Sequence, residues 1–234
     1  FTPYGLKVDF VGHPVVEGGA AKGNGAAFRA EHGIAENEKL LCVLPGSRRS
    51  EIKYLLPVFK DAVALLAQKH PDMKIVVPTV STVQYAVKAA VKDWALPVSV
   101  VEGETARYDA FAAADAALAA SGTVALELAM AKVPYTIAYK MNPVSSFLAR
   151  KLVSGKYANL VNILADGEIV KEYLLEDCKP DLLAAEIEKL LTDEAYKNAE
   201  VDGAFDVLKR LGADGAETPS QKAADAILDL IKEK

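Results

Sequence analysis

Residues 40–48, LLCVLPGSR, carry five consecutive apolar residues followed by proline, glycine, serine and arginine. An uninterrupted apolar run of this length predicts a strand that is buried on both faces, and the Pro-Gly pair predicts where it ends. Residues 51–69 follow with apolar side chains at helical spacing. A buried strand joined by a glycine turn to a long helix is the building unit of a parallel α/β sheet.

The same alternation continues on the carboxyl side of this unit. Further apolar strands are predicted at residues 75–77, 98–101, 116–120 and 134–139, with helices between them at 82–92, 105–114 and 124–132. Helical crossovers between buried strands are typical of parallel sheets with right-handed connections. We therefore predict an α/β protein in which a doubly wound, Rossmann-like parallel sheet has helices on both faces.

The remainder of the chain predicts a helical extension and an entry segment. Helices are expected at 143–152, 168–175, 180–191, 195–211 and 220–234, a strand-like stretch occupies 8–11, and a Gly/Ala-rich flexible loop spans 18–25. The glycine-containing residues 212–215 separate the last two helices. We accordingly divide the chain into an entering linker and strand (1–17), a ligand-binding domain (18–211) and a helical tail (212–234).

Composition and charge narrow the classes of function. Hydrophobic residues make up 51% of the chain and the net charge is −5, which argues against a disordered chain and against a nucleic-acid-binding surface. The 39 alanines predict much helix packed closely around a slim sheet. The two cysteines and three histidines lack metal-ligand spacing, so we expect no metal site, and Cys42 is predicted to be a buried apolar residue of a protein from a reducing compartment. No apolar run is long enough to span a membrane.

The first candidate site follows the strand at 40–44. In open parallel sheets, ligands bind beyond the carboxyl ends of the strands. Gly46 allows a tight turn, and Ser47 precedes a helix whose first amides can bind an anion. Arg48 or Arg49 adds a planar cation suited to phosphate. The competing interpretation is a serine that only caps the helix, beside solvated arginines.

The second candidate site follows the strand at 116–120. Ser121, Gly122 and Thr123 place small residues and hydroxyls before a helix, where a diphosphate could bind. Glu127 lies near the start of that helix, where a carboxylate is stabilised by the helix dipole and could accept hydrogen bonds from ribose hydroxyls. The alternative is a capped helix with a favourably placed acid.

Three further features have two interpretations each. Asn162 lies among apolar residues and is either the organiser of a loop, which its chemistry alone favours, or a ligand contact. His13 either touches a substrate or has a structural role, the commoner case for a lone histidine. The amphipathic residues 145–156 either lie on a membrane surface or, as is commoner, pack on the core.

Taken together, several short segments have a family resemblance. They are VGHP at 11–14, LPGSR at 44–48 with Glu51, ASGT at 120–123 with Leu126 and Glu127, YKMNP at 139–143, NILA at 162–165 and QKAAD at 221–225. In this order they resemble the lipid-A-disaccharide synthases, inverting glycosyltransferases of the GT-B class. The resemblance extends over essentially the whole chain and is specific as a set, although each segment alone is a weak signal.

The resemblance implies a reaction and a division of labour. The family transfers 2,3-diacylglucosamine from UDP-2,3-diacylglucosamine to 2,3-diacylglucosamine 1-phosphate and releases UDP, with no cofactor and no metal. Its carboxyl-terminal half binds the donor, whereas its amino-terminal half binds the acceptor and carries the general base. This chain begins at Phe1 without a methionine and resembles only the donor half, so we expect the acceptor domain to be missing and the chain alone to be inactive.

The resemblance also implies roles for individual residues. Arg48 would be catalytic by offsetting charge on the departing UDP, and Glu127 would bind the ribose. The residues expected around the phosphates are Gly46, Ser47, Ser121, Gly122 and Thr123. Asn162 would lie near the donor, in a loop that departs from the family pattern at Val161 and at residues 166–167.

The resemblance implies partners and a location as well. The lipid substrates imply a cytoplasmic protein peripheral to the inner membrane, and the helical tail is expected to cross to the acceptor domain or to exchange between the subunits of a homodimer. Two other classes stay open. One is another UDP-sugar enzyme such as a UDP-N-acetylglucosamine 2-epimerase, whose catalytic acids and histidines we do not find. The other is a non-catalytic nucleotide-binding or assembly module.

Overall fold

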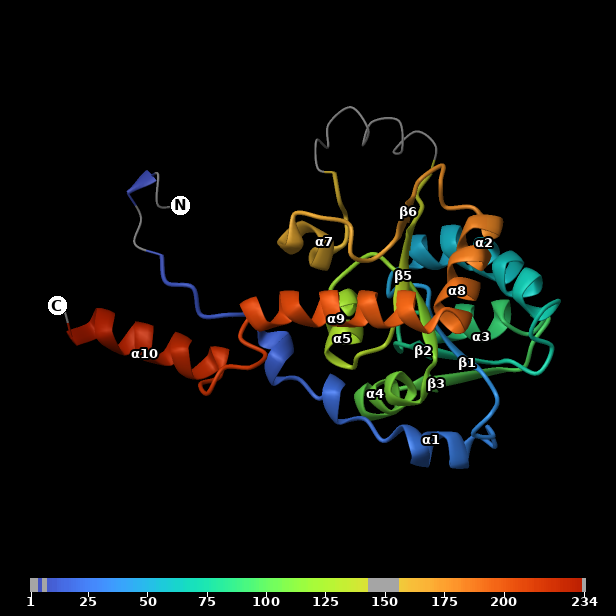
Figure 1. Ribbon diagram of the computed structural model, residues 1–234, viewed down its shortest axis with the longest axis horizontal. Coiled ribbons are helices and arrows are strands. Elements are labelled where there is room, and N and C mark those ends of the chain that lie inside the picture. The colour runs from blue at the N-terminus through green and yellow to red at the C-terminus, as the bar shows by residue number, and fades with distance from the viewer. Residues whose placement is uncertain (1–3, 6–7, 143–155, 233–234) are drawn as a thin grey trace.

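The computed structural model describes residues 4–5, 8–142 and 156–232 and contains one six-stranded sheet (Figure 1). Its strands are β1 (Leu40–Leu44), β2 (Lys74–Thr79), β3 (Val98–Glu102), β4 (Ala116–Ala120), β5 (Tyr135–Tyr139) and β6 (Glu172–Leu174). All neighbouring strands are parallel, in the order β3-β2-β1-β4-β5-β6. This is the doubly wound Rossmann order, and it confirms the predicted fold class.

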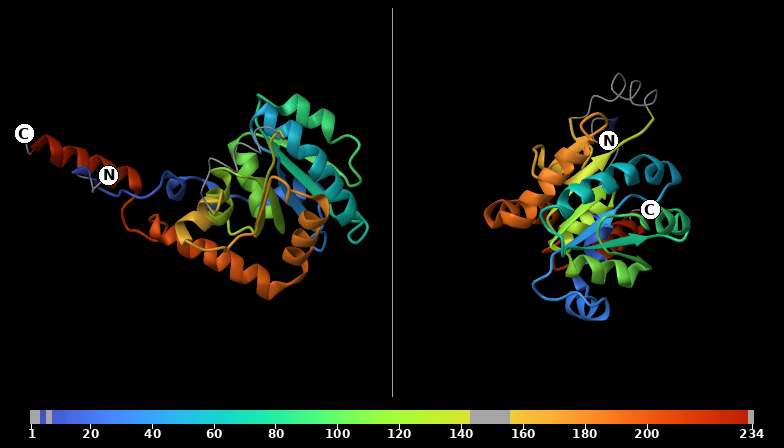
Figure 2. Two further views of the ribbon diagram at one scale, coloured as in Figure 1. Left: turned by 90° about the horizontal axis from the view of Figure 1, so that it is seen from above. Right: turned by 90° about the vertical axis from the view of Figure 1, so that its right-hand side faces the viewer.

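Helices cover both faces of the sheet, as Figures 1 and 2 show. They are α1 (Gly25–Glu31), α2 (Arg49–Ala67), α3 (Gln84–Ala90), α4 (Glu104–Ala113), α5 (Val124–Met130), α7 (Leu160–Ala165), α8 (Pro180–Thr192), α9 (Glu194–Arg210) and α10 (Pro219–Lys232), with short 3-10 turns at Pro14–Glu17 and Ala20–Lys22. The predicted helices within 49–132 and 180–232 are confirmed to within a few residues at their ends. None of the helices within the described ranges is long and apolar enough to cross a bilayer.

The buried side chains form two cores, one on each side of the sheet. Leu41 and Val43 of β1 pack with α2, α3 and α8, whereas Leu40, Cys42 and Leu44 pack with α1, α4, α5 and α9. Successive side chains of a strand point to opposite faces, so a strand between two helical layers must be apolar at every position. Cys42 is fully buried, as predicted, and burial raises the pKa of its thiol.

Two expected elements differ in the structure. Residues 168–175 were expected to be helical, but they include the edge strand β6, whose residues 172–174 pair with residues 137–139 of β5. The exposed edge of β5 supplies hydrogen-bond partners that local periodicity does not reveal. Residues 8–11, expected to be strand-like, form no strand and leave Phe10 72% exposed, because no neighbouring strand pairs with them.

Part of the Gly/Ala-rich stretch 18–25 is packed, because Ala20 is buried in a 3-10 turn and two of the glycines lie against α4, which corrects the expectation of a flexible loop. A Cβ added to Gly23 would lie 2.0 Å from the carbonyl oxygen of Tyr108, and one added to Gly25 would lie 2.3 Å from that of Ala112. These glycines therefore allow the backbone to approach α4 closely. The helix expected at 143–152, and the amphipathic segment at 145–156 except for its last residue, lie outside the described residues.

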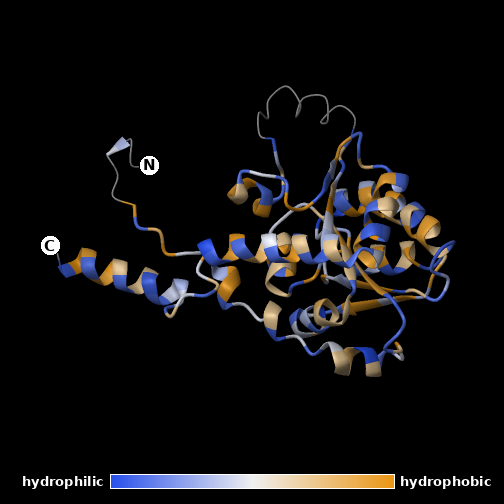
Figure 3. Cartoon of the chain, in the orientation of Figure 1, coloured by the Kyte–Doolittle hydropathy of each residue, from blue (hydrophilic) through white to orange (hydrophobic). Residues whose placement is uncertain are grey.

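The tail follows a break at Gly212 and leaves the body of the sheet (Figures 1 and 2). A shallow pocket lined by residues 9–11 and by Glu217, Lys222 and Asp225 shows that α10 lies beside the entering segment. Figure 3 shows orange apolar positions along this helix, and Ile227, Leu228, Leu230 and Ile231 are exposed there. The division at residues 17 and 211 stays a proposal about domains.

Candidate functional site

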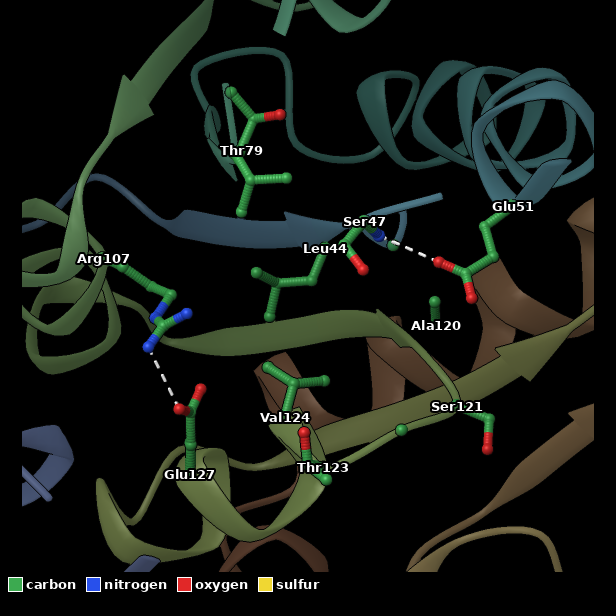
Figure 4. A pocket seen from close by; sticks show the side chains of 13 residues that line it. Leu44, Ser47, Glu51, Thr79, Arg107, Ala120, Ser121, Thr123, Val124 and Glu127 are labelled. Carbon is green, nitrogen blue, oxygen red and sulfur yellow. Dashed lines mark hydrogen bonds and ion pairs between the residues drawn. The ribbon is translucent and has the colours of Figure 1, made fainter. Parts of the chain in front are cut away.

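A pocket lies beyond the carboxyl ends of β1, β2 and β4 (Figure 4). Its cavity volume is about 170 Å³, which is smaller than the roughly 300–1,000 Å³ of a typical small-molecule pocket. The pocket is at the point where the strand order reverses between β1 and β4, the usual ligand position in doubly wound sheets. The lining residues are Leu44, Gly46, Ser47, Glu51, Thr79, Val80, Arg107, Ala120, Ser121, Gly122, Thr123, Val124 and Glu127.

At the first junction, the Glu51 carboxylate accepts the hydrogen bonds of backbone N–H groups that would otherwise be free to bind a ligand. Glu51 Oε2 accepts hydrogen bonds from the backbone N–H groups of Ser47 (2.8 Å) and Arg48 (3.1 Å). This close approach requires Gly46, which has a φ of +103°, because an added Cβ would lie 2.2 Å from that oxygen. A carboxylate at the amides of a helix start is favourable, and it marks the position as one that accepts an anion.

Arg48 lies outside the pocket lining. It precedes the first residue of α2, its side chain is 78% exposed, and its guanidinium contacts Glu51 Oε1 at 2.7 Å. Glu51 thus pairs with the charge of Arg48 and also accepts the hydrogen bonds of the two backbone N–H groups in the turn. The competing interpretation is therefore wrong in detail: Glu51 rather than a serine caps the helix, through the amides of Ser47 and Arg48 that precede it, and Arg48 is paired with Glu51.

At the second junction, only one of the two hydroxyl side chains has a hydrogen-bond partner within the described residues. Ser121 donates its hydroxyl hydrogen to the carbonyl oxygen of Ala158 at 3.2 Å, whereas the Thr123 hydroxyl has no hydrogen bond within the described residues. A Cβ added at Gly122 would meet no atom within 4 Å, so this glycine borders open space. The junction therefore presents a small, polar wall that a ligand could approach closely.

Glu127 and Arg107 of α4 face each other at one side of the pocket (Figure 4). A guanidinium nitrogen of Arg107 donates to Glu127 Oε1 at 3.0 Å and to the Tyr108 hydroxyl at 3.2 Å. Burial raises the pKa of the Glu127 carboxyl, and the charge of Arg107 opposes that shift. The sequence reasoning missed Arg107. The available signal was its place in the first turn of the helix that follows β3, whose carboxyl end lies at the same edge of the sheet.

Asn162 is fully buried and does not line the pocket. Its amide nitrogen donates to the Val170 carbonyl (2.7 Å) and to Glu172 Oε1 (2.6 Å), and its amide oxygen accepts from the N–H groups of Ile169 and Val170. In this structure Asn162 organises a loop, which is the role that its chemistry alone favoured.

Glu172, also missed from the sequence, completes that loop. Its Oε2 accepts from the backbone N–H groups of Ala158 and Asn159 at 2.7 and 3.1 Å. Because Ser121 bonds to the carbonyl of Ala158, this network reaches the pocket wall indirectly. His13 has a local role as well, since its Nδ1 accepts from the N–H of Val15.

The structure thus brings six of the eight candidates into one pocket: Gly46, Ser47, Ser121, Gly122, Thr123 and Glu127. Arg48 and Asn162 do not line it. Within the described ranges, no group of histidine, cysteine, aspartate or glutamate side chains could hold a metal ion.

Solved structures share this fold. A glycosyltransferase involved in lipopolysaccharide biosynthesis, WaaG, superposes with a TM-score of 0.57 at 18% identity, over 87% of this chain and 50% of that chain. Anabaena HepE in complex with UDP-glucose superposes with a TM-score of 0.57 at 15% identity, over 88% of this chain and 52% of that one. The fold is therefore that of one Rossmann-like half of a GT-B glycosyltransferase.

Sequence relatives identify the family. The chain is 55% identical to the lipid-A-disaccharide synthase of Paramagnetospirillum magneticum and 48% identical to that of Rhodospirillum centenum, in each case over 100% of this chain. It spans only 60% and 58% of the length of these two relatives. The family model described as lipid-A-disaccharide synthetase matches residues 1–226. The chain belongs to the lipid-A-disaccharide synthase family.

Proposed function

We propose that this chain is the donor-binding part of a lipid-A-disaccharide synthase. The whole enzyme would transfer 2,3-diacylglucosamine from UDP-2,3-diacylglucosamine to 2,3-diacylglucosamine 1-phosphate and release UDP. The observation that carries the proposal is the convergence of the two glycine-containing junctions and Glu127 on one pocket at the switch point of the sheet, in a member of this family.

The pocket supports a role for each of its polar groups. The hydroxyls and amides of Ser47, Ser121 and Thr123 would donate hydrogen bonds to the diphosphate, and Gly46 and Gly122 would let it approach the backbone. Glu127 would accept hydrogen bonds from the ribose. The amides now bonded to Glu51 would become available to phosphate oxygens if that carboxylate turned away.

We assign leaving-group stabilisation to Arg48. A guanidinium placed where negative charge develops on departing UDP lowers the barrier to bond breaking. Arg48 is exposed and only one residue from the pocket lining, so a rotation of its side chain away from Glu51 would bring its charge to the mouth of the pocket. The general base, the acceptor site and contact with the cytoplasmic face of the inner membrane belong to the whole enzyme in this proposal.

The tail is the contact to the rest of the enzyme in this proposal. Four large apolar side chains of α10 are exposed, more than a lone surface helix normally leaves uncovered. They would pack against the acceptor domain or against a second copy of the chain. Light scattering distinguishes these two occupants, because only the second produces a dimer of this chain.

Calorimetric titration with UDP tests the proposed site. We expect saturable binding by the 234-residue chain, at least tenfold weaker after Arg48→Ala or Glu127→Ala, because each removes about 1.5–3 kcal/mol of charge-assisted interaction. Arg49→Ala is the matched control, since it removes the neighbouring arginine, to which this proposal assigns no contact with UDP. No binding by the folded chain, or equal losses in the control, would contradict the assignment.

A further inference from the structure

The ion pair between Arg107 and Glu127 leaves one carboxylate oxygen available. Glu127 Oε1 accepts from Arg107 at 3.0 Å and from the Tyr108 hydroxyl at 3.5 Å, whereas Oε2 has no partner within the described part of the chain. The two side chains are 29% and 21% exposed, so the pair is only partly screened by water. Figure 4 shows the two groups facing one another where α4 and α5 border the pocket.

Arg107 is itself held in a defined orientation. Its guanidinium lies over the Tyr108 ring, 4.9 Å from the ring centroid, and donates to the Tyr108 hydroxyl at 3.2 Å. Tyr108 is buried and packs on Phe111 in the core beneath α4. The planar guanidinium is therefore fixed on one side by an aromatic ring and presents its edge to Glu127, which a flexible lysine would do less well.

We propose that Arg107 is a positioning residue that makes the pocket selective for nucleotides with a free hydroxyl on the ribose at the position that Glu127 contacts. By binding Oε1, Arg107 turns Oε2 toward the place where a sugar hydroxyl would donate. Its charge also lowers the pKa of Glu127, against burial and the charge of Glu104, which raise that pKa. This inference rests on the proposed function, in which Glu127 recognises the ribose. It adds that recognition depends on a residue from a different helix.

A purely structural role for the pair predicts a different result. If Arg107 only tied α4 to α5, its loss would weaken the binding of every nucleotide to the same extent. If Arg107 positions Glu127, its loss affects the hydroxyl contact and leaves the contacts to base and diphosphate. The ratio of the affinities for UDP and for deoxy-UDP therefore distinguishes the two roles.

The experiment measures the binding of UDP, 2′-deoxy-UDP and 3′-deoxy-UDP to the whole chain and its variants by calorimetry. We expect the unchanged chain to prefer UDP over at least one deoxy nucleotide by about tenfold, the value of a hydrogen bond to a charged group. In Arg107→Met, UDP affinity should fall by about tenfold and that of the deoxy nucleotide by less than about twofold. Arg107→Lys should recover part of the preference, and Arg210→Met is the matched control outside the pocket.

The pH dependence of that ratio is a second readout. The diphosphate is the same in both ligands, so its titration cancels and the ratio reports the ionisation of Glu127. Preference for UDP should be lost as the pH falls and Glu127 takes up a proton, and this loss should begin at a higher pH in Arg107→Met.

The outcomes separate the inference from the proposed function. An undiminished preference for UDP in Arg107→Met overturns the inference while leaving the site in place. No binding of UDP by the unchanged chain overturns the proposed function and the inference with it. If Arg107→Met fails to fold, as shown by circular dichroism, the preference in Arg107→Lys decides: an unchanged ratio and pH profile overturn the inference, and a reduced ratio supports it.

Discussion

At the scale of single residues, the site depends on close contacts that the addition of a single side-chain atom would disrupt. Gly46 has a φ of +103°, a region that side-chain-bearing residues rarely adopt, and it faces the Glu51 carboxylate directly. Gly103 has a nearly equal φ of +99°, but an added Cβ there would meet no atom within 4 Å. These two glycines therefore separate backbone strain from steric overlap.

Gly46→Ala should destabilise the protein by about 2–4 kcal/mol and Gly103→Ala by about 1–2 kcal/mol, because only the first adds a clash to the strained backbone. Urea denaturation measures both. We also expect Gly46→Ala to displace Glu51 from the amides of Ser47 and Arg48, which NMR shifts of those amides would report. Equal losses of stability in the two variants would show that Glu51 does not approach Gly46 so closely.

At the scale of elements, the connection from α7 to β6 is held by polar side chains. Asn162 on α7 bonds to Val170 and to Glu172 on β6, and Glu172 in turn accepts from the backbone that enters α7. Buried polar groups are stable only when they are satisfied, so this short segment depends on all its members. The segment was expected to be helical because periodicity over eight residues does not distinguish a helix from a three-residue edge strand.

Asn162→Asp should lower the free energy of unfolding by about 2–5 kcal/mol, because it replaces a buried donor by a charge that faces Glu172 and the Val170 carbonyl. Asn198→Asp, at an exposed position of α9, is the matched control and should change stability by less than about 0.5 kcal/mol. Thermal denaturation at neutral pH compares them. Unchanged stability with weakened UDP binding would instead favour the role of ligand contact for Asn162.

At the scale of the whole molecule, a buried acid joins the sheet to the outer helices. Glu200 of α9 is 4% exposed, and its Oε1 accepts from the N–H of Tyr135 at the start of β5 with a distance of 2.7 Å. Its Oε2 is buried and has no partner within the described chain. Burial raises the pKa of this carboxyl to about 8, so the folded protein holds a proton that the unfolded chain releases near pH 4.5.

The free energy of unfolding should consequently fall as the pH rises from about 4.5 to about 8. In this range the folded protein binds the proton and the unfolded chain does not, so a higher pH favours the unfolded chain. Glu200→Gln keeps an acceptor for Tyr135 and cannot ionise. Relative to the unchanged protein, the free energy of unfolding of this variant should rise by up to about 1.4 kcal/mol for each pH unit within that window. Urea denaturation at several pH values measures this. Glu194→Gln, exposed on the same helix, is the control, and parallel profiles for the two variants would contradict the buried charge.

Much of the fold could be predicted from the sequence because its signals are local. The apolar run at 40–44 must be buried on both faces, and helices must cover it, so the parallel α/β class follows from pattern alone. The same pattern also predicts that Ser47 and Glu127 lie at one edge of the sheet, since the carboxyl ends of parallel strands meet there.

Other features depended on contacts between distant segments. Residues 18–25 resemble a loose loop until α4 lies against them, and residues 8–11 resemble a strand although no neighbour pairs with them. Arg107 meets Glu127 only because the fold places α4 and α5 on the same side of the sheet. Propensity is a property of a few neighbouring residues, whereas these features depend on which surfaces meet.

The sequence by itself determined the class of fold, the switch point where a ligand is expected and, through its short segments, the family. Only the tertiary structure decided that Glu51 occupies the amides of the first junction, that Asn162 is buried in a loop and that Glu127 is held by Arg107. The physical reason is the distance along the chain over which each interaction acts. Burial and helix periodicity are encoded within a few residues, whereas hydrogen bonds and ion pairs between side chains exist only once packing has set their distances.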